Sequence, residues 1–396
     1  MKKLGLAYII PIIIAVSFLY WHYEKINFLF FYEEIPDITD SSFRYIDNFH
    51  NNRFYEEQFL AGENNSETIF LLGSSELSGN TPALPYNFIS DRFKTKLKAV
   101  GFEGNQCFSI YAQLLANEQR LKNAPVIVVL SPGWFESKAA GGISSSTFLK
   151  YNSERFLHKA ISGENNSEFH AYLFKRIARL YNEFNSPGIE LKLMNFKYYA
   201  SKSYFHRAVF SPLIFFDKLL LAMKEKITLR LKPDGAGFKR FPIIPESVSV
   251  NWDSLYVASK EEGKKRATNN NLGIADSYYS EHIHGRVGRI QPVDKMFNTE
   301  LEDFFMLVKL LKEKEVNASF IISPLNALYY KNIKDILPTI NIIESEIKAH
   351  GFSYLNLLET DTAKYDKAML QDVMHLSDYG WYKADHFIIE TYHLSQ

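Results

Sequence analysis

The chain has 396 residues, 46% of them hydrophobic and 23% charged, which is ordinary for a globular protein with one large α/β domain or two modest domains. Lys plus Arg balances Asp plus Glu at 45 each, and this zero net charge argues against a nucleic-acid-binding protein, which normally carries a basic excess. A single cysteine, Cys107, excludes an intrachain disulfide and a cysteine-based zinc site.

The N-terminal residues have the pattern of a membrane anchor. Lys2 and Lys3 precede residues 4–21, which contain no charged side chain and span about 27 Å as a helix. The two lysines favour a cytoplasmic N-terminus, and aromatic side chains at the far end suit the headgroup level. We therefore predict a tail at 1–3 and one transmembrane helix at 4–21. A cleaved signal peptide and a buried core helix are the alternatives, but no small-residue cleavage site follows Phe18.

The rest of the chain, outside the cell membrane on this reading, begins with a polar segment. Residues 22–66 combine short amphipathic stretches with several Asn and Asp, which indicates an extracytoplasmic stalk. A catalytic domain is predicted to follow at 67–396.

Four buried strands are predicted in that domain, most of them ending abruptly at small or turn-forming residues: 68–72, 126–130, 318–322 and 352–358. Amphipathic helical patterns lie at 300–316, 333–350 and 378–393. Unpaired apolar strands that alternate with such helices indicate a mostly parallel sheet covered on both faces. The predicted class is therefore α/β.

A stretch at about 136–300 interrupts this alternation. It begins with a flexible run of Ala, Gly and Ser, contains helical segments such as 169–184, and then becomes polar and irregular. We interpret it as a helical insertion or cap on the sheet.

A serine pair follows the first predicted strand. Ser74 and Ser75 lie after Gly73, at a strand-to-helix turn where a hydroxyl can be exposed and neighbouring N–H groups can face a developing oxyanion. By itself the pattern is more typical of a turn and helix cap than of a nucleophile.

An acid and a histidine near the C-terminus give the serine pair a partner. Asp372 precedes His375 by three residues, just before the last predicted helix. This spacing allows the carboxylate to orient the imidazole, which can then take the proton from a serine. Serine is a poor nucleophile without such a base. The two distant motifs together are more specific than either one.

With these motifs the chain resembles the SGNH-type hydrolases, and more closely the DltD family of teichoic acid D-alanylation. The resemblance rests on the N-terminal anchor and on five further segments: LLGSSEL at 71–77, GNQ at 104–106, SPGWF at 131–135, SPLN at 323–326 and DVMHLSDYGW at 372–381. It spans nearly the whole chain and implies an SGNH-hydrolase-like three-layer sandwich.

The resemblance also implies roles for individual residues. Ser75 would be the nucleophile, His375 the general base and Asp372 its orienting acid, while the Gly104 N–H would help to form the oxyanion hole. SGNH hydrolases supply an Asn side chain where this chain has Gly133 and Trp134, and DltD-like proteins also lack that Asn. They commonly carry Gln where Gly133 stands, which leaves the details of donor and acceptor binding open.

Several other residues are candidates for the site. Ser74, beside the nucleophile, is predicted to belong with the residues that contact the oxyanion or the substrate. Glu76 either caps the turn after the serine or contacts an ammonium group of the substrate, and Trp134 either walls the site or packs in the core. Cys107 is interpreted as a buried apolar residue rather than a nucleophile. His282 and His284, the remaining pair, suit a solvated loop better than a metal site.

These roles predict an extracytoplasmic enzyme, anchored by one helix, that esterifies lipoteichoic acid with D-alanine through an acyl-Ser75 intermediate. No metal or organic cofactor is required. The implied partners are a D-alanyl donor or carrier, the lipoteichoic acid acceptor, and a membrane-bound acyltransferase with other D-alanylation proteins. An esterase or thioesterase with the same triad, and a non-catalytic assembly protein, remain alternatives.

Overall fold

The computed structural model describes residues 13–18, 20–21, 43–46, 68–79, 81–93, 95–118, 121–152, 167–182, 204–205, 208–209, 212, 238–240 and 249–395. Most of the predicted transmembrane segment, 4–21, lies outside these ranges. Among the described residues no helix has the length and apolar character needed to cross a membrane. Of the predicted stalk, 22–66, only 43–46 is described.

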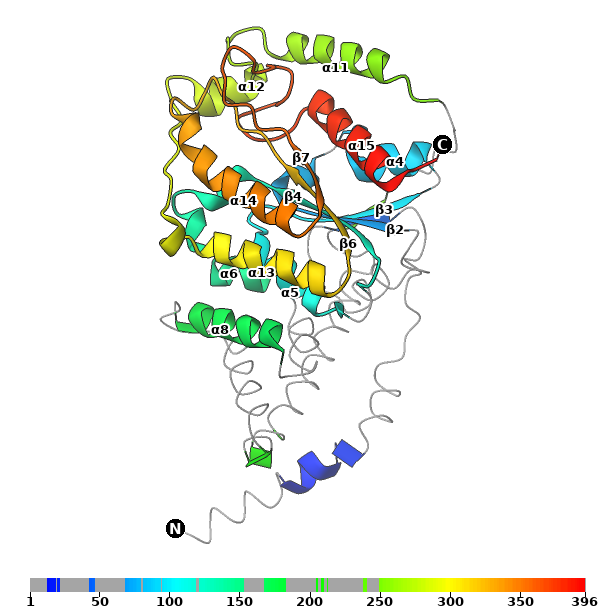
Figure 1. Ribbon diagram of the computed structural model, residues 1–396, viewed down its shortest axis with the longest axis vertical. Coiled ribbons are helices and arrows are strands. Elements are labelled where there is room, and N and C mark those ends of the chain that lie inside the picture. The colour runs from blue at the N-terminus through cyan, green and yellow to red at the C-terminus, as the bar shows by residue number, and fades with distance from the viewer. Residues whose placement is uncertain are drawn as a thin grey trace.

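A seven-stranded sheet forms the centre of the described structure (Figure 1). Six neighbouring strands run parallel and one edge strand is antiparallel. Their spatial order is β5 (Phe238–Arg240), β1 (Phe43–Ile46), β3 (Lys96–Val100), β2 (Thr68–Leu72), β4 (Pro125–Leu130), β6 (Asn317–Ile322) and β7 (Ser353–Asn356). The four predicted strands are confirmed as β2, β4, β6 and β7, and the predicted mostly parallel sheet is confirmed with them.

Three strands were not predicted, because their sequences do not form long apolar runs. In β3 lysines alternate with apolar residues, yet Lys98 is only 5% exposed. The prediction of a stalk at 22–66 is wrong at residues 43–46, which form β1 and pair with β3 in the sheet. Tyr45 and Ile46 are buried there, and the Tyr45 hydroxyl donates a hydrogen bond to the carbonyl oxygen of Gly101 at 2.8 Å. Burial between neighbouring strands explains why this short segment is extended.

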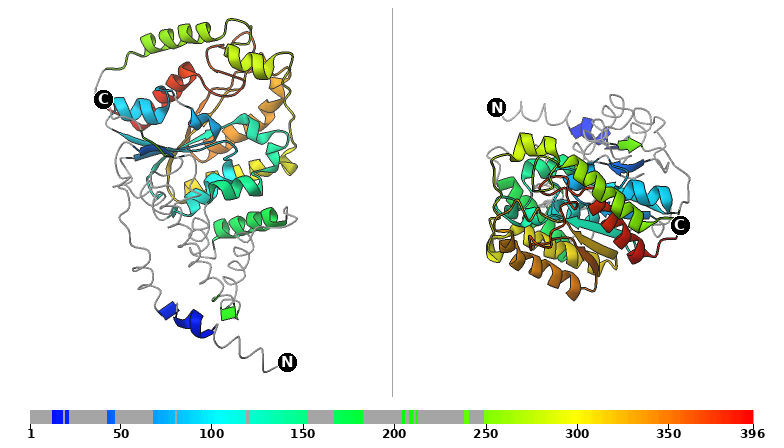
Figure 2. Two further views of the ribbon diagram at one scale, coloured as in Figure 1. Left: turned by 180° about the vertical axis from the view of Figure 1, so that it is seen from behind. Right: turned by 90° about the horizontal axis from the view of Figure 1, so that it is seen from above.

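Helices cover both faces of the sheet (Figures 1 and 2). One face carries α4 (Pro85–Arg92) and α15 (Asp378–Tyr392), with α11 (Trp252–Arg266) packed against α15. The other face carries α5 (Cys107–Leu115), α13 (Thr299–Glu313) and α14 (Leu337–Ala349), with α6 (Ser145–Tyr151) and α8 (Glu168–Asn182) further out. The helices predicted at 169–184, 300–316, 333–350 and 378–393 are thereby confirmed as α8, α13, α14 and α15.

Helix α5 is a core helix that was not predicted from the sequence. All nine of its residues are buried, including Ser109 and Gln113. A helix that is covered on every side needs no polar stripe, so periodicity alone does not reveal it.

The predicted insertion at about 136–300 contributes to the sheet as well as to its surface. Its strand β5 pairs with β1, and α8 and α11 lie on opposite sides of the molecule (Figure 1). Residues 153–166 and most of 183–248 lie outside the described residues.

The direction in which the chain connects successive strands across the sheet reverses at β2. The chain passes from β2 to β3 on one side and then returns to β4 on the other side. In open α/β sheets, loops at the carboxyl ends of strands diverge at such a point and leave room for a ligand. The loops after β2 and β4 begin at Gly73 and Ser131, at this point of the sheet.

Candidate active site

The loop after β2 holds Ser75 in a tight arrangement with the loop after β3. The Gly73 N–H donates to the carbonyl oxygen of Val100 at 3.1 Å, and the Asn105 side-chain amide donates to the Gly73 carbonyl oxygen at 2.7 Å. A Cβ added at Gly101 would lie 2.3 Å from the same oxygen, so a glycine is required there. Ser75 then begins the short helix η1 (Ser75–Ser78).

Ser75, His375 and Asp372 form a continuous line of hydrogen bonds. The Ser75 Oγ lies 2.9 Å from His375 Nε2, and His375 Nδ1 lies 2.7 Å from Asp372 Oδ2. The other carboxylate oxygen of Asp372 accepts the backbone N–H groups of Met374 and His375, both at 2.8 Å. The fold therefore brings together side chains separated by 300 residues in the sequence.

The pKa shifts of Asp372 and His375 suit a general base, His375, supported by an acid, Asp372. Burial raises the pKa of Asp372, but its hydrogen bonds with His375 and with backbone N–H groups bring that pKa below the ordinary value. Burial lowers the pKa of His375, whereas Asp372, and then Glu76 and Glu103, raise it above its ordinary value. With Nδ1–H donated to Asp372, the neutral imidazole presents an Nε2 lone pair to the Ser75 hydroxyl. Such an arrangement can deprotonate Ser75 for attack on an acyl carbon.

The two adjacent serines have different surroundings. The Ser74 hydroxyl donates to the carbonyl oxygen of Phe102 at 3.1 Å and accepts the Gly104 N–H at 3.2 Å. Ser74 is thus hydrogen-bonded to the loop after β3, and Ser75 is the serine that contacts His375.

Gly104 lies beside the serine pair with a restricted backbone. Its φ is +82°, and an added Cβ would lie 2.9 Å from Thr147 Cγ2, so a larger residue is excluded by both conformation and space. The Gly104 N–H, predicted as an oxyanion donor, is held by the Ser74 oxygen. Stabilising an oxyanion would require this N–H to be shared with, or released from, Ser74.

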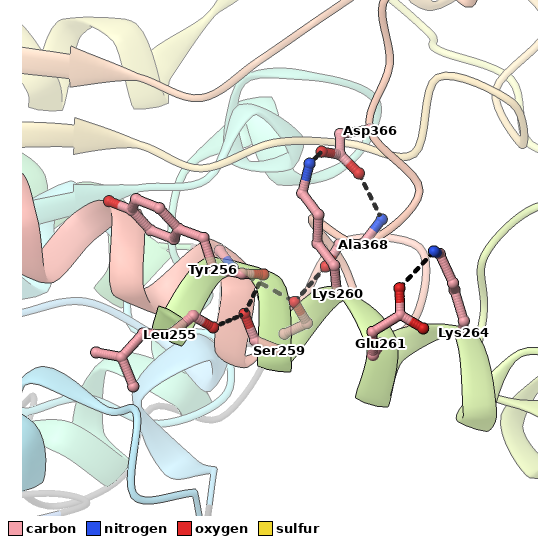
Figure 3. A network of polar contacts seen from close by, with 10 residues as sticks. Leu255, Tyr256, Ser259, Lys260, Glu261, Lys264, Asp366 and Ala368 are labelled. Carbon is pink, nitrogen blue, oxygen red and sulfur yellow. Dashed lines mark hydrogen bonds and ion pairs between the residues drawn. The ribbon is translucent and has the colours of Figure 1, made fainter. Parts of the chain in front are cut away.

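A helix of the predicted insertion supports the loop that carries Asp372 and His375. Lys260 of α11 contacts the Asp366 carboxylate at 2.6 Å, and Asp366 accepts the Ala368 N–H at 3.0 Å (Figure 3). The Ser377 hydroxyl donates to the Ala368 carbonyl oxygen. These contacts hold the loop at both its beginning and its end.

The polar stretch near residue 275 provides a second support for this loop. The Ala275 N–H donates to the Gln371 carbonyl oxygen at 2.9 Å. Ile274, Ile283 and Val373 form a small buried cluster next to that hydrogen bond. This polar, irregular stretch therefore helps to position the loop that carries Asp372 and His375.

Asn326 joins these two segments, a role that sequence reasoning missed. Its backbone N–H donates to the Val373 carbonyl oxygen at 3.0 Å, and its side-chain amide donates to the Leu272 carbonyl oxygen at 3.0 Å. The available signal was its position in the SPLN motif, directly after a buried strand.

Glu76 and Trp134, the remaining predicted site residues, are both only 7% exposed. Trp134 belongs to the main core cluster, so its surroundings are those of a packing residue. The Glu76 Oε1 is buried and has no hydrogen-bond partner among the described residues. Burial raises the pKa of Glu76, while N–H groups of the turn and the nearby His375 partly offset that rise.

The other nucleophile and metal candidates are separate from the triad. Cys107 is fully buried, and burial raises the pKa of its thiol well above the ordinary value, which disfavours the reactive thiolate. His282 and His284 are exposed, and His282 lies in a helical turn (Tyr279–Ile283) where a loop was predicted. Within the described part of the chain, no three or more His, Cys, Asp and Glu side chains are placed to hold a metal ion.

Comparisons with known proteins place the sequence within one family. The family model described as "DltD protein" matches residues 44–393. Protein DltD of Bacillus subtilis (strain 168) is 24% identical over 338 residues, which cover 81% of this chain and 81% of the relative. Protein DltD of Staphylococcus aureus (strain NCTC 8325 / PS 47) is 23% identical over 331 residues, with 80% of this chain and 78% of the relative covered.

Proposed function

The chain belongs to the DltD family, and we propose that it is a serine-dependent acyltransferase that esterifies teichoic acid with D-alanine at the outer face of the cell membrane. The observation that carries this proposal is the line from Ser75 Oγ through the His375 imidazole to Asp372, with distances of 2.9 and 2.7 Å. The charge-free run at 4–21 supports a membrane anchor that keeps the catalytic domain near lipoteichoic acid.

The first half of the reaction transfers the acyl group to the protein. Ser75 Oγ attacks the carbonyl carbon of a D-alanyl ester or thioester, and His375 Nε2 takes the hydroxyl proton. The charge on Asp372 stabilises the imidazolium that forms. When the tetrahedral intermediate collapses, the bond to the leaving group breaks and His375 returns the proton to that group. The product is D-alanyl-Ser75.

The second half repeats these steps with a different nucleophile. A hydroxyl of the polymer gives its proton to His375 and attacks the acyl carbon, and the bond to Ser75 Oγ breaks. Ser75 then recovers the proton from His375. Transfer exceeds hydrolysis when the polymer hydroxyl, rather than water, occupies this position. The donor is supplied by a carrier or a membrane-bound acyltransferase of the D-alanylation machinery.

Replacing Ser75 with Ala tests the proposal in cells. In a bacterial strain that lacks its own DltD protein, we expect the intact chain to restore D-alanyl esters on teichoic acid. The Ser75→Ala variant, expressed at the same level, should leave them at the level of the deletion strain. Full restoration by the variant would instead support a non-catalytic assembly role. Ser345→Ala is the matched control and should restore the esters as the intact chain does, because Ser345 is exposed on α14 and its hydroxyl donates to the Asn341 carbonyl oxygen of the same helix.

A biochemical experiment separates transfer from hydrolysis. The purified chain is incubated with a labelled D-alanyl thioester and lipoteichoic acid, and the label is followed in the polymer and in free D-alanine. We expect polymer-bound label that depends on Ser75. Label recovered only as free D-alanine would contradict the transferase proposal and identify a thioesterase.

A further inference from the structure

The acidic side chain beside the nucleophile has a position that the triad mechanism does not use. Glu76 follows Ser75 in the first turn of η1 and is 7% exposed. Its Oε1 accepts no hydrogen bond from the described residues. A buried carboxylate oxygen without a partner is costly, since it has lost its hydration without replacement. A group that supplies the missing hydrogen bond would therefore bind favourably.

The charges around His375 indicate which kind of group this is. Three carboxylates act on the imidazole, those of Asp372, Glu76 and Glu103. Asp372 is already satisfied by the imidazole and two backbone N–H groups. Glu103 is exposed, so solvent screens its charge. Glu76 remains as the enclosed carboxylate with one oxygen, Oε1, that has no partner among the described residues, and this arrangement favours a cation next to Ser75.

Lack of a partner alone would not define a site, as Asp385 demonstrates. Asp385 is 0% exposed and neither of its carboxylate oxygens has a partner among the described residues. The charge that acts on it is that of Arg92, whereas the charge that acts on Glu76 is that of His375. Proximity to the catalytic base is therefore what distinguishes Glu76.

We propose that Glu76 binds the α-ammonium group of the acyl substrate and so selects aminoacyl donors over simple acyl donors. This inference rests on the proposed D-alanyl transfer. In a D-alanyl ester only the α-carbon separates the ammonium from the carbonyl carbon that Ser75 attacks. The Glu76 carboxylate acts on His375, which contacts Ser75, so it is close enough to the reacting carbonyl group to pair with that ammonium. The pair forms a charge-assisted hydrogen bond in an enclosed site, where such bonds are strong.

Two donors that differ only in the amino group test this proposal. The purified full-length chain is given the D-alanyl or the propionyl thioester of one thiol, and kcat/KM is measured from thiol release, with Ser75 acylation verified by intact mass spectrometry. We expect the protein to prefer the D-alanyl thioester. In Glu76→Gln, kcat/KM for this donor should fall about 10- to 100-fold, the range of a lost hydrogen bond to a charged group. For the propionyl thioester it should change by less than about threefold.

Glu103→Gln is the matched control, because Glu103 also acts on His375 but is exposed. We expect small and equal changes with both donors. Glu76→Asp, which keeps the charge on a shorter side chain, should retain part of the preference and covers the case in which the Gln variant folds poorly. Circular dichroism reports folding for each variant.

The outcomes distinguish this inference from the proposed function. An equal fall with both donors in Glu76→Gln would show that Glu76 acts through His375, and an unchanged preference would show that it does not contact the ammonium. Either result overturns the inference alone. If Glu103→Gln abolishes the preference as Glu76→Gln does, the assignment to Glu76 is also wrong. Absence of Ser75 acylation by either donor in the unmodified chain would contradict the proposed function itself.

Discussion

Buried acidic side chains in two regions of the molecule have different partners. In the helical layer, Asp303 is 0% exposed and accepts hydrogen bonds from Arg176 Nε at 2.7 Å, Arg176 Nη2 at 2.9 Å and the Tyr172 hydroxyl at 2.6 Å. At the carboxyl edge of the sheet, the enclosed Glu76 Oε1 has no such partner among the described residues.

The difference indicates what each acid does. Burial raises the pKa of Asp303, and the charge of Arg176 together with the hydrogen bonds from Arg176 and Tyr172 opposes that rise. Arg176 in turn lies over the Phe108 ring at 4.9 Å, so the pair connects α8, α13 and α5. Asp303, an acid that serves the fold, receives its partners from the protein itself. At the triad, Asp372 accepts three hydrogen bonds from the protein, whereas Glu76 Oε1 accepts none from the described residues.

The largest expected effect comes from replacing Asp372, whose carboxylate accepts three hydrogen bonds from the protein. Asp372→Asn removes the charge that stabilises the imidazolium and reverses the preferred tautomer of His375. We expect kcat for acyl transfer to fall about 10⁴-fold, with little change in thermal stability. Steady-state kinetics and a melting curve on the same preparation check both parts. A large loss of stability with full activity would mean that Asp372 belongs with Asp303 as a structural acid.

The next effect concerns the structural pair. Arg176→Met leaves Asp303 buried without its cation, and we expect the free energy of unfolding to fall by about 3–5 kcal/mol. Urea denaturation at neutral pH measures this change. The additional substitution Asp303→Leu should recover much of the loss, because no uncompensated charge then remains. A single variant as stable as the unmodified chain would show that Arg176 does not stabilise the buried Asp303.

An exposed ion pair on the same protein supplies a control for that experiment. Lys264 and Glu261 lie 2.6 Å apart on α11, with their side chains 72% and 57% exposed. Lys264→Met should leave the denaturation midpoint unchanged, because solvent and salt screen such pairs.

The last expected effect has the opposite sign. The folded-state pKa of Glu76 is raised above its ordinary value of 4.5, so its contribution to stability is full below pH 4.5 and is lost as the pH rises through the folded-state pKa. Glu76→Gln cannot ionise and escapes this loss. We expect the ligand-free variant to equal the unmodified chain below pH 4.5 and to exceed it by about 1 kcal/mol at neutral pH. Melting curves across this range measure the difference, and a less stable variant at neutral pH would indicate that the carboxylate has a partner in the free protein.

Much of the central sheet could be predicted because β2 and β4 are nearly continuous apolar runs and β6 is mostly apolar, as suits strands buried on both faces. The triad residues could be selected because their spacing after β2 and before α15 suits acyl chemistry. β1 and β3 could not be predicted from the same signal. Their polar residues lie in the sheet only because neighbouring strands and helices cover them.

The local sequence also left the supports of the site undetermined. Asn326 and Ala275 are separated by about fifty residues, and both donate to the loop that carries Asp372 and His375. No local periodicity relates them, because their contacts depend on how the loops after different strands meet. The interpretation of Glu76 as a helix cap was open for the same reason.

The sequence by itself determined the α/β class, the apolar strands, the charge-free N-terminal run and the residue types of a serine-based site. These properties are local, since each depends on side-chain chemistry at short spacing. Only the tertiary structure decided that Ser74 binds to the β3 loop while Ser75 contacts His375. It alone decided that Glu76 is enclosed with a carboxylate oxygen unpartnered among the described residues. Burial and long-range hydrogen bonds arise from segments hundreds of residues apart, and the free energy of these contacts exists only once those segments meet.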